Sequence, residues 1–270
     1  MAPTDRYLDL LERVLLRQGF EDGLVRDALP DGWAGPATAP ARRLLARRGL
    51  RVVEPLTADP RDREEGRDWP PTAETMIGRH RLRHLRRCVE TILADGVPGD
   101  LLEAGVWRGG AAIMMRAVLA AHEVTDRTVW LADSFAGLPP STHPEDLADG
   151  LALDGFPELA VSEESVRANF DRYGLLDEQV RFVRGWFADT LAGLPAERFA
   201  LIRLDGDLYE STRDAIAALY PRLAPGGFLV VDDYGAIPAC ARAVHDYRDA
   251  HGITDPIEWI DWTGVWWRKS

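Results

Sequence analysis

From about residue 100 onward, short apolar segments alternate with segments of helical periodicity. The apolar segments cover residues 101–104, 128–132, 180–183, 199–204 and 228–231. Helical patterns occur over 110–121, 165–173, from about 210, and over 239–250, and residues 257–268 are typical of a hairpin. Strands that alternate with helices favour a largely parallel sheet covered on both faces. The sequence therefore predicts an α/β fold with an antiparallel hairpin at one edge.

Residues 1–70 follow a different pattern. Tyr7, Leu8, Leu11, Val14 and Leu15 are spaced as on one face of a helix, and residues 30–40 have the glycine and proline content of a loop. The charged run 61–67 is expected to be solvated. We expect a helical and loop appendage over 1–70, followed by one domain over 71–270.

Charge and cysteine content exclude several classes of protein. The net charge of −12 argues against a nucleic-acid partner, and no apolar run of about 18 residues predicts a membrane span. Cys88 and Cys240 have no partner at a spacing typical of disulfide frameworks or thiolate metal sites. The N-terminus does not have the pattern of a signal peptide, so a cytoplasmic location is expected.

A glycine-rich turn follows the first expected strand of the sheet. The segment 103–110 has the spacing G-x-x-x-G-G, which differs from the G-x-G-x-x-G of dinucleotide folds. Such a turn lets a ligand approach the backbone closely, although the glycines can also serve only a tight turn. Glu103, at the strand end, can face a cationic group of a ligand. Asp133, after the second strand, stands where ribose-binding acids occur.

Acidic residues also follow the fourth and fifth expected strands. Asp205 and Asp207 come after 199–204, and Asp232 and Asp233 come after 228–231. Paired strands lie about 4.8 Å apart, so these acids converge if the two strands are neighbours. Clustered carboxylates repel and call for a cation, and oxygen ligands alone favour Mg²⁺. The alternative is that Asp207 caps the next helix while the other acids are solvated.

Five stretches resemble the macrocin O-methyltransferase family, which methylates sugar hydroxyls on antibiotics such as macrolides and aminocoumarins. They are residues 75–78, 102–110, 133–139, 204–212 and 225–234, of which E-A-G-V-W-R-G-G and L-D-G-D-L-Y-E-S-T are the most specific. The resemblance implies a Rossmann-like class I methyltransferase with a mostly parallel seven-stranded sheet, a C-terminal antiparallel hairpin and an N-terminal helical appendage that covers the active site. It further implies S-adenosylmethionine as cofactor, a glycosylated small molecule as acceptor, and a homo-oligomer, dimer or higher.

The resemblance also implies roles for particular residues. Asp205, Asp232 and Asp233 would hold Mg²⁺, with Asp205 as the general base, and Tyr209 would contact the acceptor or else pack on the following helix. Trp186 and Phe187 would stack on adenine, or else belong to the core. The implied cofactor-binding residues are Thr75, Met76, Glu103, Ala104, Gly105, Val106, Trp107, Asp133, Ser134, Phe135, Gly137, Ser162, Trp186, Phe187 and Asp205.

Two other interpretations remain open at the level of sequence. Asp205-Gly206-Asp207 also matches the D-x-D site of metal-dependent glycosyltransferases. The second interpretation is a methyltransferase-like scaffold that has lost its activity. The presence of all three expected metal ligands argues against it.

Overall fold

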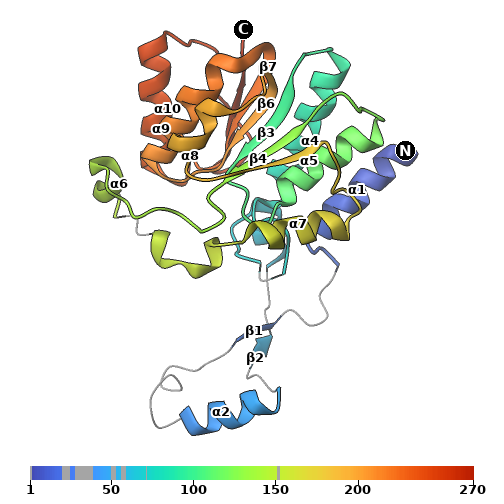
Figure 1. Ribbon diagram of the computed structural model, residues 1–270, viewed down its shortest axis with the longest axis vertical. Helices are drawn as coiled ribbons and strands as arrows, with labels where there is room; N and C mark the ends of the chain where they lie inside the picture. Colours follow the sequence, from blue (N-terminus) through green and yellow to red (C-terminus); the bar gives the residue numbers. More distant parts are fainter. Residues whose placement is uncertain are drawn as a thin grey trace.

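A seven-stranded sheet forms the centre of the protein (Figure 1). The computed structural model describes residues 2–19, 25–27, 39–49, 53–55, 59–70, 72–150 and 153–270. The strands of the sheet are β3 (Asp100–Ala104), β4 (Val129–Asp133), β5 (Val180–Arg184), β6 (Phe199–Leu204), β7 (Leu223–Val231), β8 (Glu258–Trp259) and β9 (Val265–Arg268). β3 to β7 are parallel, and β9 and β8 extend the β7 edge antiparallel to their neighbours. The expected α/β fold with its C-terminal hairpin is confirmed.

The order of the strands determines where a ligand can bind. The sheet has the order β5-β4-β3-β6-β7-β9-β8, so the chain moves outward from β3 in one direction and then returns to build the other half from β6. The two strands adjoining this reversal, β3 and β6, pair in parallel. In open α/β sheets a crevice forms beyond the carboxyl ends of the strands at such a switch point.

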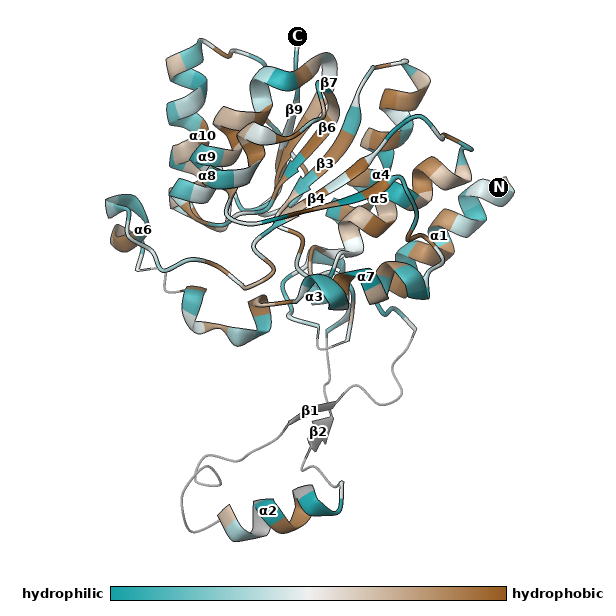
Figure 2. Cartoon of the chain, viewed as in Figure 1, coloured by the Kyte–Doolittle hydropathy of each residue, from teal (hydrophilic) through white to brown (hydrophobic). Residues whose placement is uncertain are grey.

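Helices cover both faces of the sheet. One face carries α1 (Pro3–Leu15), α4 (Gly78–Ala94), α5 (Gly110–Ala121) and α7 (Glu163–Arg172), and the other carries α8 (Phe187–Thr190), α9 (Tyr209–Leu219) and α10 (Pro238–His251). The strands are mostly apolar between helices whose outer faces are polar (Figure 2). Leu8 and Leu15 of α1 are fully buried in the same core as α4 and α5, so the first helix is part of the main body.

The remaining elements lie at the periphery. They are β1 (Val25–Asp27), α2 (Ala39–Arg47), β2 (Val53–Pro55), α3 (Pro60–Glu65), α6 (Pro144–Ala148) and the 3-10 turns Leu153–Gly155, Pro157–Leu159, Leu191–Gly193 and Tyr220–Arg222. β1 pairs with β2, and Figure 1 shows this pair and α2 well away from the sheet. Most of the loop expected over 30–40 falls outside the described residues.

Two local predictions from the sequence are wrong. Asp207 does not cap α9, because the N-cap is Leu208 and the first helical N–H, that of Tyr209, donates to Asp146 Oδ1 at 2.7 Å. The run 61–67 is not uniformly solvated, because Arg63 of α3 is only 7% exposed. The Tyr209 N–H has its acceptor 63 residues away in the sequence, and the Arg63 guanidinium binds the carbonyl oxygen of Met76.

Within the described ranges, no helix combines the length and apolar character needed to cross a bilayer. Cys88 and Cys240 are both buried and free.

The tips of β3 and β6 approach closely at Gly105. This glycine has φ of +91°, and a Cβ added to it would overlap the carbonyl of Asp205, whose carbon would lie 2.6 Å away. Gly105→Ala should therefore destabilise the fold by about 4 kcal/mol or more, since strain and overlap with backbone act together. Gly96, with φ of +65° and no atom within 4 Å of an added Cβ, provides the control. Gly96→Ala should cost only about 1–2 kcal/mol. Urea unfolding followed by circular dichroism measures both, and equal losses would contradict the close approach.

Candidate active site

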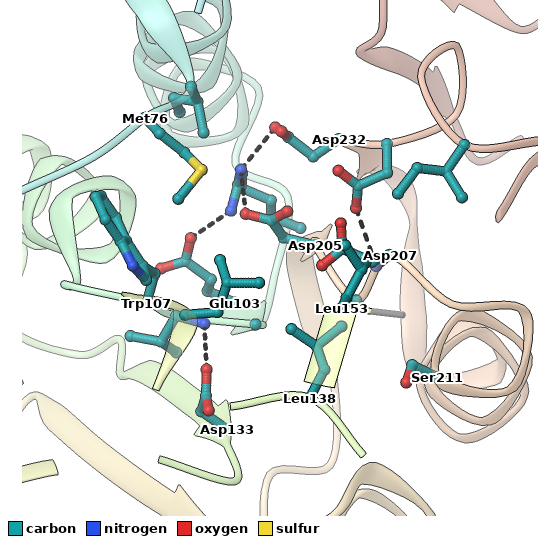
Figure 3. A pocket seen from close by; sticks show the side chains of 18 of the residues that line it. Met76, Glu103, Trp107, Asp133, Leu138, Leu153, Asp205, Asp207, Ser211 and Asp232 are labelled. Atoms are coloured by element: carbon teal, nitrogen blue, oxygen red, sulfur yellow. Dashed lines mark hydrogen bonds and ion pairs between the residues drawn. The ribbon is translucent and has the colours of Figure 1, made fainter. Parts of the chain in front are cut away.

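A large cavity opens beyond the carboxyl ends of β3 and β6 (Figure 3). Its volume is about 670 Å³, within the range of small-molecule sites. The strand ends contribute acidic residues to its wall, and residues 66–69, which follow α3, contribute part of its rim. The topology of the sheet thus brings together the segments that the sequence singled out.

Asp133 anchors the glycine turn at one side of the cavity. Its Oδ2 accepts the N–H of Val106 at 2.7 Å, and its Oδ1 accepts the N–H of Phe135 at 2.7 Å. Burial raises the pKa of Asp133, and the backbone N–H groups of Val106 and Phe135 counteract this rise. The carboxyl group therefore fixes the turn after β3 against the turn after β4, and its remaining lone pairs can accept further hydrogen bonds from a ligand.

A buried arginine joins the ends of three strands. Arg203, one residue before the carboxyl end of the central strand β6, is 2% exposed. Its Nη1 donates to Glu103 Oε1 at 2.6 Å, at the end of β3, and its Nη2 donates to Asp232 Oδ1 at 2.6 Å, after β7. The same Nη2 lies 2.8 Å from Asp205 Oδ2. One guanidinium thus holds three carboxylates.

Glu103 keeps one oxygen available to the cavity. It lines the cavity, and its Oε2 is buried without a hydrogen-bond partner among the described residues. Burial raises the pKa of Glu103 to about 8, although the neighbouring Arg203 lowers it. An unpartnered buried oxygen of this kind is suited to a cationic group of a ligand.

Asp205, Asp232 and Asp233 form a compact group of oxygen ligands. One carboxylate oxygen of each lies within 4.8 Å of the others. Burial tends to raise the pKa of Asp232, but the Arg203 and Arg81 guanidiniums beside it bring that pKa below its usual value. In contrast, burial and the neighbouring Asp207 and Asp205 carboxylates raise the pKa of Asp233 well above its usual value.

The carboxyl groups around this site outnumber the guanidinium groups. Glu103, Asp205, Asp207, Asp232 and Asp233 supply five carboxyl groups, whereas Arg81 and Arg203 supply two positive charges. The pKa of Asp207 rises to about 7, because it is buried and faces Asp205 and Asp232. Carboxylates that the fold leaves in excess and close together fit a hard divalent cation such as Mg²⁺.

Most of the residues expected from the sequence line the cavity. They are Thr75, Met76, Glu103, Gly105, Val106, Trp107, Asp133, Ser134, Gly137, Trp186, Phe187, Asp205, Asp232 and Asp233. Figure 3 shows Met76, Glu103 and Trp107 on one side of the group that includes Asp205 and Asp232.

Four of the expected residues do not line it. Ala104 is buried in β3, where its carbonyl accepts the N–H of Asp205, and Phe135 is buried beside Phe182. Ser162 caps α7, with its Oγ accepting the N–H of Ser165 at 3.2 Å. Tyr209 has its hydroxyl donating to Asp246 at 2.7 Å and its ring stacked on His143. These four residues thus contact other parts of the fold. For Tyr209, the contacts agree more closely with packing against neighbouring elements than with an acceptor contact.

Sequence reasoning missed the arginines of the site. Arg81 of α4 donates to Asp232 and, at 2.9 Å, to Asp261 Oδ2, and thereby ties the C-terminal hairpin to the end of β7. A signal for Arg203 was available, because a lone charge inside the apolar strand 199–204 needs a carboxylate partner. Arg81 offers no such signal in a helix rich in arginine.

Removal of the Arg203 charge should strongly destabilise the protein. Arg203→Met leaves three carboxylates without their shared partner, and the expected loss is about 3–5 kcal/mol at about pH 8. Without Arg203, the folded-state pKa values of those carboxylates would lie above their unfolded-state values. Their protonation therefore stabilises the folded variant at low pH, and this stabilisation is lost as the pH rises. The deficit relative to wild type should therefore shrink at about pH 5.5. Urea unfolding at both pH values measures it.

The matched control is Arg213→Met, which removes an exposed ion pair with Asp214. Exposed pairs contribute about 0.2–1 kcal/mol, so this variant should remain close to wild type at both pH values. A deficit of Arg203→Met that is equally small, or that does not change with pH, would contradict the three-carboxylate arrangement.

Comparisons with known proteins agree with the fold and show the family. A family model described as Macrocin-O-methyltransferase (TylF) matches residues 4–269. The chain is 54% identical over 273 residues to the 8-demethyl-8-(2,3-dimethoxy-alpha-L-rhamnosyl)-tetracenomycin-C 4'-O-methyltransferase of Streptomyces olivaceus, which covers 98% of this chain and 93% of the relative. It is 55% identical over 212 residues to the mycinamicin III 3''-O-methyltransferase of Micromonospora griseorubida, with 77% and 83% covered. The structure of the O-methyltransferase NovP superposes with a TM-score of 0.84 at 44% identity and covers 99% of both chains.

Proposed function

The chain belongs to the macrocin O-methyltransferase family and is an O-methyltransferase, and we propose that it methylates a hydroxyl of a sugar on a glycosylated natural product. The names of the two relatives, one acting on a rhamnosyl tetracenomycin and one on mycinamicin III, support this acceptor class. The same relatives argue against a D-x-D glycosyltransferase. The group formed by Asp205, Asp232 and Asp233 at the end of the cavity supports an active enzyme over an inactive scaffold.

We propose S-adenosylmethionine as the methyl donor. The unpartnered Oε2 of Glu103 supports a site for the ammonium group of its methionine end, with Thr75 and Met76 beside it. Asp133, with Ser134 and Gly137 nearby, is suited to the ribose, because its carboxylate still has lone pairs that face the cavity. Trp186 is 43% exposed where it lines the cavity, and with Phe187 it offers a surface for adenine.

We propose that Asp205, Asp232 and Asp233 hold Mg²⁺. The excess of carboxylates over guanidiniums at this end of the cavity supports the assignment. When bound, S-adenosylmethionine supplies the methyl carbon, and Mg²⁺ supplies positive charge that lowers the pKa of an adjacent sugar hydroxyl.

The chain's own residues then complete the chemistry. Asp205 lies in the cavity wall. Its Oδ2, which Arg203 engages, has a second lone pair that would ligate the metal, and its Oδ1 is left to accept the proton of the acceptor hydroxyl. Burial raises the pKa of Asp205, although Arg203 lowers it, and a raised pKa makes a carboxylate a better proton acceptor. Arg203 and Arg81 keep Asp232 oriented during turnover.

The remaining features of the proposal concern the rest of the chain. Residues 66–69 at the rim of the cavity support the proposal that the segment 1–70 covers the active site. We propose a cytoplasmic location, since both cysteines are free and buried, as is usual in a reducing compartment. A homo-oligomer, dimer or higher, is proposed from family resemblance alone.

Methyl transfer should depend on a divalent cation. With S-adenosylmethionine and a panel of glycosylated natural products, mass spectrometry should detect an acceptor that gains one CH₂ unit. Removal of divalent ions with EDTA should suppress this activity by at least about 100-fold, and Mg²⁺ should restore it, because the carboxylate group alone cannot lower the pKa of the hydroxyl. Full activity in the chelator would discard the metal assignment.

The role of Asp205 is tested by the isosteric variant Asp205→Asn. Loss of the proton acceptor and of one metal ligand should reduce turnover by about 10²–10⁴-fold. Binding of S-adenosylhomocysteine, measured by isothermal titration calorimetry, should change little, because Glu103 and Asp133 are untouched. Asp214→Asn is the control, since Asp214 also lines the cavity but pairs with Arg213. Retained turnover in Asp205→Asn would exclude Asp205 as the base.

A further inference from the structure

Arg63 is a buried arginine that the proposed chemistry does not use. It lies in α3, a helix capped by Asp59 and ended by Gly66, and its side chain is 8% exposed. Asp68 is its carboxylate partner, with Oδ1 3.3 Å from Nη2. The guanidinium is too deeply buried to serve as a solubilising charge, so its remaining contacts indicate its role.

Those contacts are the carbonyl oxygens of two consecutive residues. Nη2 donates to the carbonyl oxygen of Met76 at 2.8 Å, and Nη1 makes a longer contact of 3.5 Å with that of Thr75. The side chains of both residues line the cavity. Arg63 therefore binds the backbone of a segment that lines the cavity.

The backbone carbonyl of the preceding residue, Glu74, is bound by a donor on another helix. The carbonyl oxygen of Glu74 accepts the N–H of Gly110, the first residue of α5, at 2.9 Å. A Cβ added to Gly110 would lie only 2.6 Å from that oxygen and 2.7 Å from Thr75 Cβ. Three consecutive carbonyl groups thus have donors, one on α5 and two from Arg63, which leaves the segment 74–76 little freedom to move.

The short helix that carries Arg63 is itself firmly attached. Trp262 Nε1 donates to the carbonyl oxygen of Glu65 at 2.8 Å, and Arg81 Nη2 donates to that of Gly66 at 3.2 Å. Gly66 and Gly78 lie back to back, since a Cβ on Gly66 would come within 2.6 Å of the Ile77 carbonyl carbon. α3 is thereby fixed to the start of α4, and Arg63 bridges the backbone between them.

We propose that Arg63 is a positioning residue for the amino-acid end of the cofactor. This inference rests on the proposed function, in which that end lies against Thr75, Met76 and Glu103. Arg63 touches neither the cofactor nor the acceptor, and acts by holding the backbone of residues 75 and 76. A lysine cannot reproduce this role fully, because a guanidinium presents two fixed donors whereas an ammonium group is a compact point charge.

The proposed role is directional within the cofactor. The adenosine end would bind the turns after β3, β4 and β5, where Asp133 is held by the N–H groups of Val106 and Phe135. None of those described contacts involves α3. Loss of Arg63 should therefore weaken binding of the amino-acid end of the cofactor and leave binding of the adenosine end nearly unchanged.

The experiment compares two ligands that differ only at that end. S-adenosylhomocysteine carries the amino-acid carbons, and methylthioadenosine has the same nucleoside and thioether without them. For Arg63→Met, calorimetric titration should show a rise of about tenfold in the Kd of S-adenosylhomocysteine and a change of less than about twofold for methylthioadenosine. The KM for S-adenosylmethionine should rise similarly, with kcat at saturation within about twofold of wild type.

Two further variants complete the comparison. Arg61→Met, two residues away on the same helix with an exposed side chain, should bind both ligands as wild type does. Arg63→Lys should be intermediate for S-adenosylhomocysteine, and it provides the same ligand comparison if Arg63→Met does not fold.

The outcomes separate this inference from the proposed function. Unchanged S-adenosylhomocysteine binding in the Arg63 variants, or an equal loss of both ligands, overturns the positioning role. Failure of the wild-type protein to bind S-adenosylhomocysteine at all contradicts the proposed function instead.

Discussion

The whole site depends on one ion pair network in the interior, in which Arg203 joins Glu103, Asp205 and Asp232. Each of the strands β3, β6 and β7 brings an acidic residue to the same edge of the sheet, and parallel pairing forces these acids together. Without compensation, their repulsion in a poorly solvated interior would oppose strand pairing. The guanidinium reconciles the two requirements, since its positive charge offsets part of this repulsion and lets the strands pair with their acidic residues at the cavity wall. Buried charges of this kind are costly unless every partner is present, so the arrangement is more easily explained by function than by stability.

The shared guanidinium also connects Glu103, at the end of β3, with the carboxylates that follow β6 and β7. Glu103 comes just before the glycine turn, whereas Asp205 and Asp232 belong to the group of carboxylates proposed to hold the metal. Both sets of side chains are thus oriented by one rigid, planar group on the central strand. Methyl transfer needs donor and acceptor atoms that are closely aligned, and a common anchor would keep the proposed cofactor and metal sites in a fixed relation.

The fold and the acidic cluster could be predicted because their signals are local. Alternating apolar and helical segments indicated the strands, and acids placed at strand ends indicated the crevice, since parallel strands bring their carboxyl ends to one edge. The errors concern groups whose partners are distant in the sequence. Asp207 appeared to be a helix cap, but Asp146 supplies that contact from another segment. Arg63 appeared solvated within a charged run, but the fold buries it against residues 75 and 76. No pattern within one segment reports such pairings.

The contact between Gly66 and Gly78 has a consequence for the design of chimaeras of this enzyme. Backbone meets backbone there, and an added Cβ at Gly78 would lie 2.8 Å from both the Glu64 oxygen and the Glu65 carbonyl carbon, so a larger residue at either position would separate α3 from α4. The contact therefore joins α3 to the start of α4 with no side chain between the two backbones. A protein engineer who builds such chimaeras should therefore keep both glycines unchanged, together with α1, because Leu8 and Leu15 are buried in the same core as α4 and α5.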